Sequence, residues 1–211
     1  FETGQDYTAE GGVDIKVGMQ SNLTLDLTVN PDFGQVEVDP AVINLSAAEN
    51  YYDEKRPFFI EGANIFRFGG GGINMDIGAD WGDPSFFYSR RIGRPPQGGA
   101  STPGYTKYPE WTTILSAAKV TGKIGQDWNV GLLNAVTQRE YAEIDLEGQR
   151  FEQEVEPFTY YGVARVLKEF NKGRHGLGLI ATSVIRDLRD EELTGYLPKS
   201  ALSLGLDGWL T

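Results

Sequence analysis

The sequence contains no cysteine, one histidine and two methionines among its 211 residues. Without thiols, the chain cannot form disulfides, use a cysteine nucleophile or ligate a metal through sulfur. A zinc site would depend on His175 and carboxylates alone, which is an unusual ligand set. No apolar run approaches the ~18 residues that a membrane-spanning helix needs. Basic residues are outnumbered, with 19 Lys and Arg against 30 Asp and Glu, which argues against a nucleic-acid partner because phosphate backbones attract a basic surplus.

Glycine and aromatic residues, in contrast, are abundant. The chain has 27 Gly, 11 Phe, 10 Tyr and 4 Trp, a combination that favours strands, tight turns and rings at an interface over helices. Hydrophobic residues make up 40% and charged residues 23% of the chain, so we expect a folded protein rather than a disordered one.

Strict alternation of apolar and polar residues predicts seven β-strands. A first hairpin spans residues 13–30 with its turn at 20–22. A second runs from Thr112 to Gln138 with its turn at 124–127, and a third runs from Phe158 to Arg186 with its turn at 171–174. A last alternating run covers 202–210. These strands are about 9 to 12 residues long, whereas strands of soluble sheets average ~5–6 residues.

The predicted connections alternate between short turns and long loops. The long loops are 31–111, 139–157 and 187–200, and the last two are rich in Asp and Glu. Long strands, short turns at one end and long loops at the other are typical of outer-membrane barrels. We therefore predict an all-β fold, an antiparallel outer-membrane-type β-barrel with a long, partly helical loop or plug segment. A soluble β-sandwich or lipocalin-like barrel is the alternative, because those folds alternate too.

The expected domain organisation is a single β-barrel region over residues 1–211. Bacterial single-chain membrane barrels close with an even number of strands, so seven strands would make this an incomplete barrel or fragment. Residues 31–111 lack the alternating pattern of the predicted strands. Ser46 and Glu49 have the spacing of a helix capping box, and Pro57 would end that helix. A structureless loop of ~80 residues is improbable, so we expect this inserted segment to fill the lumen or cap one mouth of the barrel.

Several stretches carry a resemblance to a known family: residues 22–37, 39–45, 54–62 and 88–93, with 117–122 and 131–137 further along. They resemble the bacterial family of unknown function usually labelled carbohydrate-binding family 9 domain-containing proteins. The resemblance implies the opening part of a predicted outer-membrane barrel region in a Gram-negative bacterium. In that family a carbohydrate-binding-like domain precedes the barrel, and this sequence lacks that domain. The resemblance implies no activity.

The barrel prediction assigns roles to two sets of residues. Arg90, Arg91 and Arg94 form a basic cluster in an acidic chain, and we expect it to line the lumen or cap or to contact headgroups. The alternative is salt bridging with acidic residues of the barrel wall. One face of the strands should meet lipid through leucines, namely Leu23, Leu25, Leu27, Leu177, Leu179, Leu202, Leu204 and Leu206.

Aromatic residues near strand ends fit the aromatic girdle of a membrane barrel, although they would also fit the core of a soluble sandwich. These are Trp111, Trp128, Phe158, Tyr160, Tyr161 and Trp209.

Catalytic chemistry has little support in the sequence. His175 follows a predicted turn and reads as a polar turn residue, not as the base of a catalytic triad. Carboxylates are numerous, but no pair is singled out for glycoside hydrolysis. We expect no catalytic residue, no metal and no cofactor.

The predicted function is therefore an outer-membrane β-barrel protein, a channel, transporter or assembly component of a Gram-negative envelope, and not an enzyme. Membrane lipid or lipopolysaccharide would be its partner, with glycans and envelope proteins as further candidates. The first alternative is a soluble or surface-attached carbohydrate-binding β-domain. The second is an enzyme acting on polysaccharide or lipid.

Overall fold

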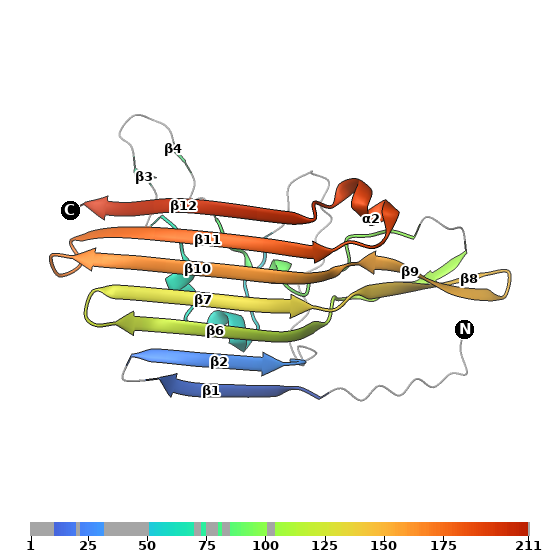
Figure 1. Cartoon of the computed structure of the whole chain (residues 1–211), viewed down its shortest axis with the longest axis horizontal. Helices are drawn as coiled ribbons and strands as arrows, with labels where there is room; N and C mark the ends of the chain where they lie inside the picture. The colour runs from blue at the N-terminus through green and yellow to red at the C-terminus, as the bar shows by residue number, and fades with distance from the viewer. Residues whose placement is uncertain are drawn as a thin grey trace.

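The computed structural model describes residues 11–19, 22–31, 51–69, 73–74, 80–81, 85–100 and 104–210. The helix start predicted at Ser46 and Glu49 lies outside these residues. Within them, the protein is built from antiparallel β-sheets with few helices (Figure 1). The predicted all-β, antiparallel class is therefore confirmed.

Seven long strands form the main sheet, in the order β1-β2-β6-β7-β10-β11-β12, and every neighbouring pair is antiparallel. Their bounds are β1 (Val13–Met19), β2 (Leu23–Val29), β6 (Ile114–Ile124), β7 (Trp128–Thr137), β10 (Phe158–Phe170), β11 (His175–Asp187) and β12 (Ser200–Leu210). These are the seven strands that the alternating pattern predicts.

The three predicted hairpins form, with the expected turns at 124–127 and 171–174; most of the turn predicted at 20–22 lies outside the described residues. β1 pairs with β2, β6 with β7 and β10 with β11. The turn between β10 and β11 places Asn171, Lys172 and Gly173 at positive φ, a conformation that Asn and Gly adopt at little cost. Figure 1 shows the short turns of the β6–β7 and β10–β11 hairpins at one end of the sheet and the longer connection between β7 and β10 at the other.

The prediction of an acidic loop at 139–157 is wrong, because these residues form a fourth hairpin. β8 (Glu140–Leu146) and β9 (Gln149–Glu156) pair with each other, and β5 (Tyr105–Lys107) adds a third strand at the edge of β8. Ala142 and Ile144 alternate with charged residues and are fully buried. Glu147 and Gly148 both have positive φ, as a two-residue hairpin turn requires. The many acidic residues obscure the alternation of buried and exposed positions that is typical of a strand.

The predicted loop 187–200 also contains regular structure. It includes α2 (Glu191–Tyr196), and the Asp190 side chain accepts hydrogen bonds from the backbone N–H groups of Glu192 and Leu193. This is N-capping, which satisfies donors that a helix otherwise leaves free.

Residues 51–69 and 85–100 form a covering segment that lies against one face of the main sheet. It contains α1 (Pro57–Ile60) and two short 3₁₀ helices, η1 (Ala63–Phe66) and η2 (Ser89–Arg91). Two very short strands, β3 (Ile73–Asn74) and β4 (Asp80–Trp81), pair with each other. The expectation of a partly helical segment within 31–111 agrees with this arrangement.

The hydrophobic core lies between the main sheet and the covering segment. Phe59, Phe66 and Ile92 of the segment cluster with residues of the sheet such as Leu133 and Ile180. Ile114 also joins this core, although alternation places it on the opposite face with Ser116. The register between β6 and β7 shifts between these two residues, and such a bulge reverses the direction of the side chain before it.

The main sheet is open among the described residues. β1 and β12 are its two edges and do not pair with each other, so no closed barrel forms there. In the part of the chain described, no helix has both the length and the apolar character to cross a bilayer.

Candidate functional site

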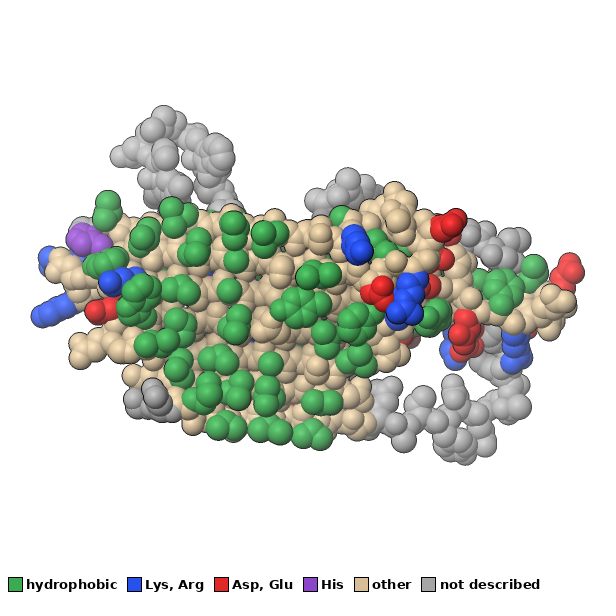
Figure 2. All heavy atoms as spheres, viewed as in Figure 1, with side chains coloured by type: hydrophobic (Ala, Val, Ile, Leu, Met, Phe, Trp, Pro, Cys, Tyr) green, Lys and Arg blue, Asp and Glu red, His purple; other side chains and the backbone are tan. Residues whose placement is uncertain are grey.

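The two faces of the main sheet differ in chemistry. One face, here called the outer face, carries the side chains of Leu202, Leu204 and Leu206, which are 69%, 63% and 69% exposed. Figure 2 shows apolar side chains spread across this face, with charged residues mostly at its two ends. The other, the inner face, carries the hydrophobic core and, among it, charged side chains that the covering segment buries. A water-soluble sheet normally places its charged side chains on the exposed face.

The eight leucines predicted to share one face do so. The register pairs Leu179 with Leu206 and Leu25 with Val120, and residues directly opposite each other point to the same side. Leu177 and Leu179 are about half exposed. Leu23, Leu25 and Leu27 lie on the same face but are partly buried between neighbouring strands.

The predicted aromatic set divides between the two faces. Trp128, Phe158 and Tyr160 lie on the outer face together with the leucines. Tyr161 and Trp209 lie on the inner face, so the girdle prediction is wrong for them. Tyr161 is part of the buried core, and Trp209 donates a hydrogen bond to the Gly173 carbonyl at 3.1 Å. The remaining member, Trp111, is exposed and lies outside the strands.

An arginine inside the covering segment joins its two halves. The Arg56 guanidinium binds both carboxylate oxygens of Glu54, at 2.8 and 2.7 Å. It also donates to the carbonyls of Ile92 at 2.7 Å and Ser89 at 2.9 Å, and it stacks over the ring of Phe59. Two stretches that carry the family resemblance, 54–62 and 88–93, are therefore bound to each other through this side chain.

Glu54 is held in its charged form by these contacts. Burial alone would raise the pKa of its carboxyl, but the hydrogen bonds and charge of Arg56, with the Ser89 hydroxyl, outweigh that effect and lower the pKa below its ordinary value. The Ser89 hydroxyl donates to Glu54 at 2.5 Å. The junction between the two halves is thus an ionised, fully hydrogen-bonded cluster.

A lysine of the sheet binds the start of the covering segment. Lys119 of β6 is 1% exposed. Its ammonium donates to the carbonyls of Phe58 and Glu61, the latter at 2.6 Å, and lies 3.4 Å from a carboxylate oxygen of Asp26 on β2. At the margin of the same cluster, Lys16 of β1 forms an ion pair with Glu61.

A second ion pair binds the covering segment at the far side of the sheet. Arg165 of β10 and Asp207 of β12 form two parallel hydrogen bonds of 2.5 and 2.7 Å, although β11 lies between their strands. One Asp207 oxygen also accepts the backbone N–H of Gly69 at 3.0 Å. Charged groups of the sheet therefore hold the covering segment near both edges.

Glycines let the segment approach the sheet closely. A Cβ atom at Gly131 of β7 would lie 2.8 Å from Ile65 and 2.9 Å from Phe66. A Cβ atom at Gly205 of β12 would lie 2.6 Å from the ring of Phe68. Both positions belong to the inner face, so here the glycines serve side-chain packing across layers.

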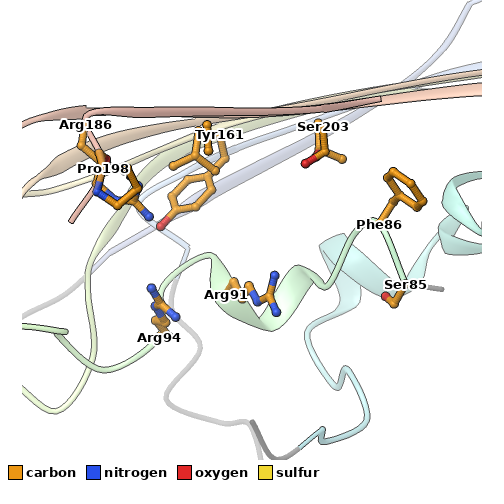
Figure 3. A pocket seen from close by; sticks show the side chains of 11 residues that line it. Ser85, Phe86, Arg91, Arg94, Tyr161, Arg186, Pro198 and Ser203 are labelled. Carbon is orange, nitrogen blue, oxygen red and sulfur yellow. Dashed lines mark hydrogen bonds between the residues drawn. The ribbon is translucent and has the colours of Figure 1, made fainter. Parts of the chain in front are cut away.

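A cavity of about 500 Å³ lies between η2 and the strands β10, β11 and β12. Its walls are formed by side chains of the covering segment below and of the inner face above (Figure 3). Among the described residues, the lining includes three arginines and no acidic side chain; these lining residues are Ser85, Phe86, Arg91, Arg94, Tyr161, Thr182, Val184, Arg186, Pro198, Ala201 and Ser203.

The structure divides the predicted basic cluster. Arg91 and Arg94 line the cavity, whereas Arg90 donates to the Asp53 carbonyl at 3.2 Å and lies over the ring of Tyr52. Sequence reasoning missed the third arginine of the cavity, Arg186 of β11. Its position in the alternation with Thr182 and Val184 already places it on the inner face.

Other chemistry is sparse in the described residues. His175 begins β11 beside the turn, as predicted. Among the residues with described positions, no group of three or more His, Asp or Glu side chains is arranged to hold a metal ion.

Comparison with known proteins gives a family and no relative of known function. A family described as a domain of unknown function (DUF5916) matches residues 1–200. The chain belongs to this family. Neither the curated proteins nor the solved structures provided a match.

Proposed function

We propose that this member of the family forms the wall of an outer-membrane β-barrel in a Gram-negative envelope, acting as a channel, transporter or assembly component. In this proposal the outer face of the main sheet meets lipid, and the inner face borders an interior that the covering segment occupies. The single observation that carries the proposal is the reversal of the two faces: exposed leucines on one, buried ion pairs on the other.

Strand length and connection lengths support the same proposal. β10 and β11 have 13 residues each, and β6 and β12 have 11 each. A strand needs ~9–11 residues to cross a bilayer at a tilt. The turns that join β6 to β7 and β10 to β11 are short and lie at one end of the main sheet (Figure 1), as periplasmic turns do in outer-membrane barrels.

The charged inner face also fits the interior of a barrel. Lys119, Asp26, Arg165 and Asp207 are paired and hydrogen-bonded where the covering segment shields them. Lys119 and Asp207 bind the backbone of a segment that a functioning channel would have to displace or rearrange. Closure of the barrel would require strands that pair with the outer edges of β1 and β12.

Heat-modifiable mobility tests the proposal. Membrane fractions from cells that make the full protein would be run on SDS gels with and without boiling and probed with an antibody to residues 104–210. A folded membrane barrel resists SDS until it is boiled, so we expect a band in the outer-membrane fraction that shifts on boiling. A band confined to the soluble fraction, with no shift, would contradict the proposal.

A glycan-binding surface is the second candidate, favoured by one local observation. Tyr105, Tyr108 and Trp111 are all exposed within seven residues of each other, and exposed rings of this kind can stack on sugars. A glycan array probed with the folded protein tests it: binding that Trp111→Ala abolishes would support the candidate, and an empty array would remove it.

A further inference from the structure

We propose that Lys168 of β10, held between the rings of Trp128 and Phe170 on the outer face, binds the headgroup of an anionic phospholipid. The proposal rests on the proposed function, because it takes the outer face to meet lipid, and it adds the class of lipid and the position of one membrane boundary. Three observations carry it: the placement of charge on the outer face, a lysine without an acidic partner among the described residues, and the length of β10.

Charged side chains are confined to the two ends of the outer face. Among the described strand residues, Lys168 and Asp187 are the Lys, Arg, Asp or Glu side chains that this face carries. They lie at opposite ends of the paired strands β10 and β11. His175, opposite Phe170 in register, lies beyond Lys168 on the side of the turn. Figure 2 shows the same distribution, with apolar side chains between the two ends.

The two charges differ in what neutralises them. The Asp187 carboxylate accepts hydrogen bonds from Arg139 and from Arg189, both at 2.9 Å. Lys168, in contrast, forms no ion pair or side-chain hydrogen bond with any residue that the structure describes. The N–H donors of its ammonium therefore have no acceptor in that part of the chain, and an anion from outside the protein would supply one.

Two aromatic rings hold the Lys168 ammonium at the surface of the sheet. Trp128 is directly opposite Lys168 on β7, and Phe170 follows two residues later on β10, so strand geometry brings the three side chains to one face. The ammonium lies 4.9 Å from each ring centre. Glu169, next in the chain, belongs to the inner face and accepts a hydrogen bond from Asn129 at 2.8 Å. This carboxylate therefore does not occupy the lysine.

The composition of this group suits a lipid headgroup better than a soluble anion. Trp128 and Phe170 are 42% and 41% exposed, and tryptophan is enriched where a bilayer meets water. A lysine near that level extends its charged end toward the headgroups while its stem stays against apolar surface. A bound phospholipid would place its phosphate at the ammonium and its tails along the leucines of the outer face.

The length of β10 sets its two ends at opposite boundaries of an apolar layer. Phe158 and Lys168 are ten residues apart on this strand, which corresponds to roughly 33 Å at ~3.3 Å per residue. A strand tilt of about 40° projects that length onto ~25 Å, which is the height of the apolar band of outer-membrane barrels. With Phe158 at one boundary, Lys168 lies at the headgroup level of the other.

Local lipid selectivity in vesicles tests the site. The chain has no cysteine, so Leu177→Cys, opposite Lys168 in register, can carry one fluorophore beside the site. The labelled full chain is reconstituted in phosphatidylcholine vesicles that contain the same fraction of either phosphatidylglycerol or phosphatidylcholine with brominated tails. Stronger quenching by the brominated phosphatidylglycerol measures the local preference for the anionic lipid. We expect a preference of roughly fivefold, because one lysine near an anionic surface contributes about that factor.

Three variants in the same labelled background assign the preference to Lys168. Lys168→Gln should abolish it, and Lys168→Arg, which keeps the charge, should retain it. The matched control is Lys123→Gln, which removes a lysine at the same end of the sheet whose side chain lies on the inner face and pairs with Glu169. This variant should leave the preference unchanged.

A second fluorophore, at Leu204→Cys in the middle of β12, separates failure of this site from failure of the barrel proposal. If neither brominated lipid quenches at 177 or at 204, the outer face does not meet lipid, and both proposals fail. If both lipids quench at 204 but phosphatidylglycerol is not preferred at 177, the headgroup site alone is overturned. The same conclusion follows if Lys168→Gln keeps the full preference.

Discussion

The two faces of the main sheet are made by the same seven strands, yet they follow opposite rules. The outer face exposes leucine, valine and isoleucine without any covering element among the described residues. The inner face buries lysine, arginine and aspartate beneath a segment that those same charges hold in place. Because neighbouring residues of a strand point to opposite sides, the alternation of residue types along each strand determines this contrast. It teaches that the inner face combines a hydrophobic core with buried ion pairs, whereas the outer face exposes apolar side chains.

The largest expected effect comes from breaking the ion pair of the inner face. Arg165→Met would leave the Asp207 carboxylate buried without its partner, which typically costs about 3–5 kcal/mol of stability. Urea unfolding followed by tryptophan fluorescence would measure the loss.

Two further variants make that experiment specific. Arg174→Met removes an exposed arginine in the turn between β10 and β11 and should cost little. Combining Arg165→Met with Asp207→Asn removes both charges and should restore part of the stability. If Arg165→Met were as stable as Arg174→Met, the inner face would not depend on its charges.

The next effect is expected on the outer face. Leu204→Arg places a charge in the middle of β12, where we expect a cost of roughly 2–4 kcal/mol in a bilayer. Unfolding of the protein in lipid vesicles would measure it, with Leu204→Phe as the apolar control. A change within about 0.5 kcal/mol, which is usual for a water-exposed site, would mean that this face meets water.

A smaller effect should follow from crowding the contact between the two layers. Gly131→Ala adds a methyl group against Ile65 and Phe66, and overpacking of this kind costs about 1–3 kcal/mol. Limited proteolysis should cut residues 51–69 faster in this variant. Gly18→Ala is the control, because a Cβ atom there meets no other atom within 4 Å. Equal proteolysis of the two variants would show that the segment is not seated on β7.

The smallest effect is a dependence on pH at the junction between the halves of the covering segment. The pKa of Glu54 is lower in the folded protein than its ordinary value of 4.5. Its contribution to stability is therefore complete above that ordinary value and is lost as the pH falls through the lower, folded-state pKa. The hydrogen-exchange protection of residues 51–69, measured relative to unstructured amides at the same pH, should fall in that acidic range for wild type.

The matching variant is Glu54→Gln, which cannot ionise. Its hydrogen-exchange protection should be lower than that of wild type at neutral pH and should change less on acidification. A wild-type protein and a Glu54→Gln variant with parallel pH profiles would contradict the assigned role of this carboxylate.

Sequence reasoning located the main sheet because its strands alternate without interruption. Val13 to Val29 and Trp128 to Thr137 each repeat with period two, so both their faces and their partners follow from the pattern. It missed β8 and β9 because Glu143 and Glu152 occupy exposed positions that raise the acid content above that of a typical strand. Alternation alone places Ile114 on the outer face, and the bulge that turns its side chain into the core leaves no signal in the composition.

The candidate site was only half predictable. Arg91 and Arg94 stand out as neighbours in sequence. Their position beside Arg186 in one cavity depends on how the covering segment lies on β11. Arg56 likewise reaches Ser89 and Ile92 across more than thirty residues. Contacts of this kind depend on how loops pack in three dimensions, and the local pattern of residues in the sequence does not predict them.

The central claim, that the outer face meets lipid, is tested most directly by a cysteine scan of β12. The sequence has no native cysteine, so single variants at 201, 202, 203, 204 and 206 can each carry one fluorophore. The protein would be placed in vesicles whose lipid tails carry bromine, which quenches fluorescence on contact. The account predicts quenching at 202, 204 and 206 and none at 201 and 203. Uniform fluorescence, with positions 202, 204 and 206 open to a water-soluble thiol reagent, would contradict it.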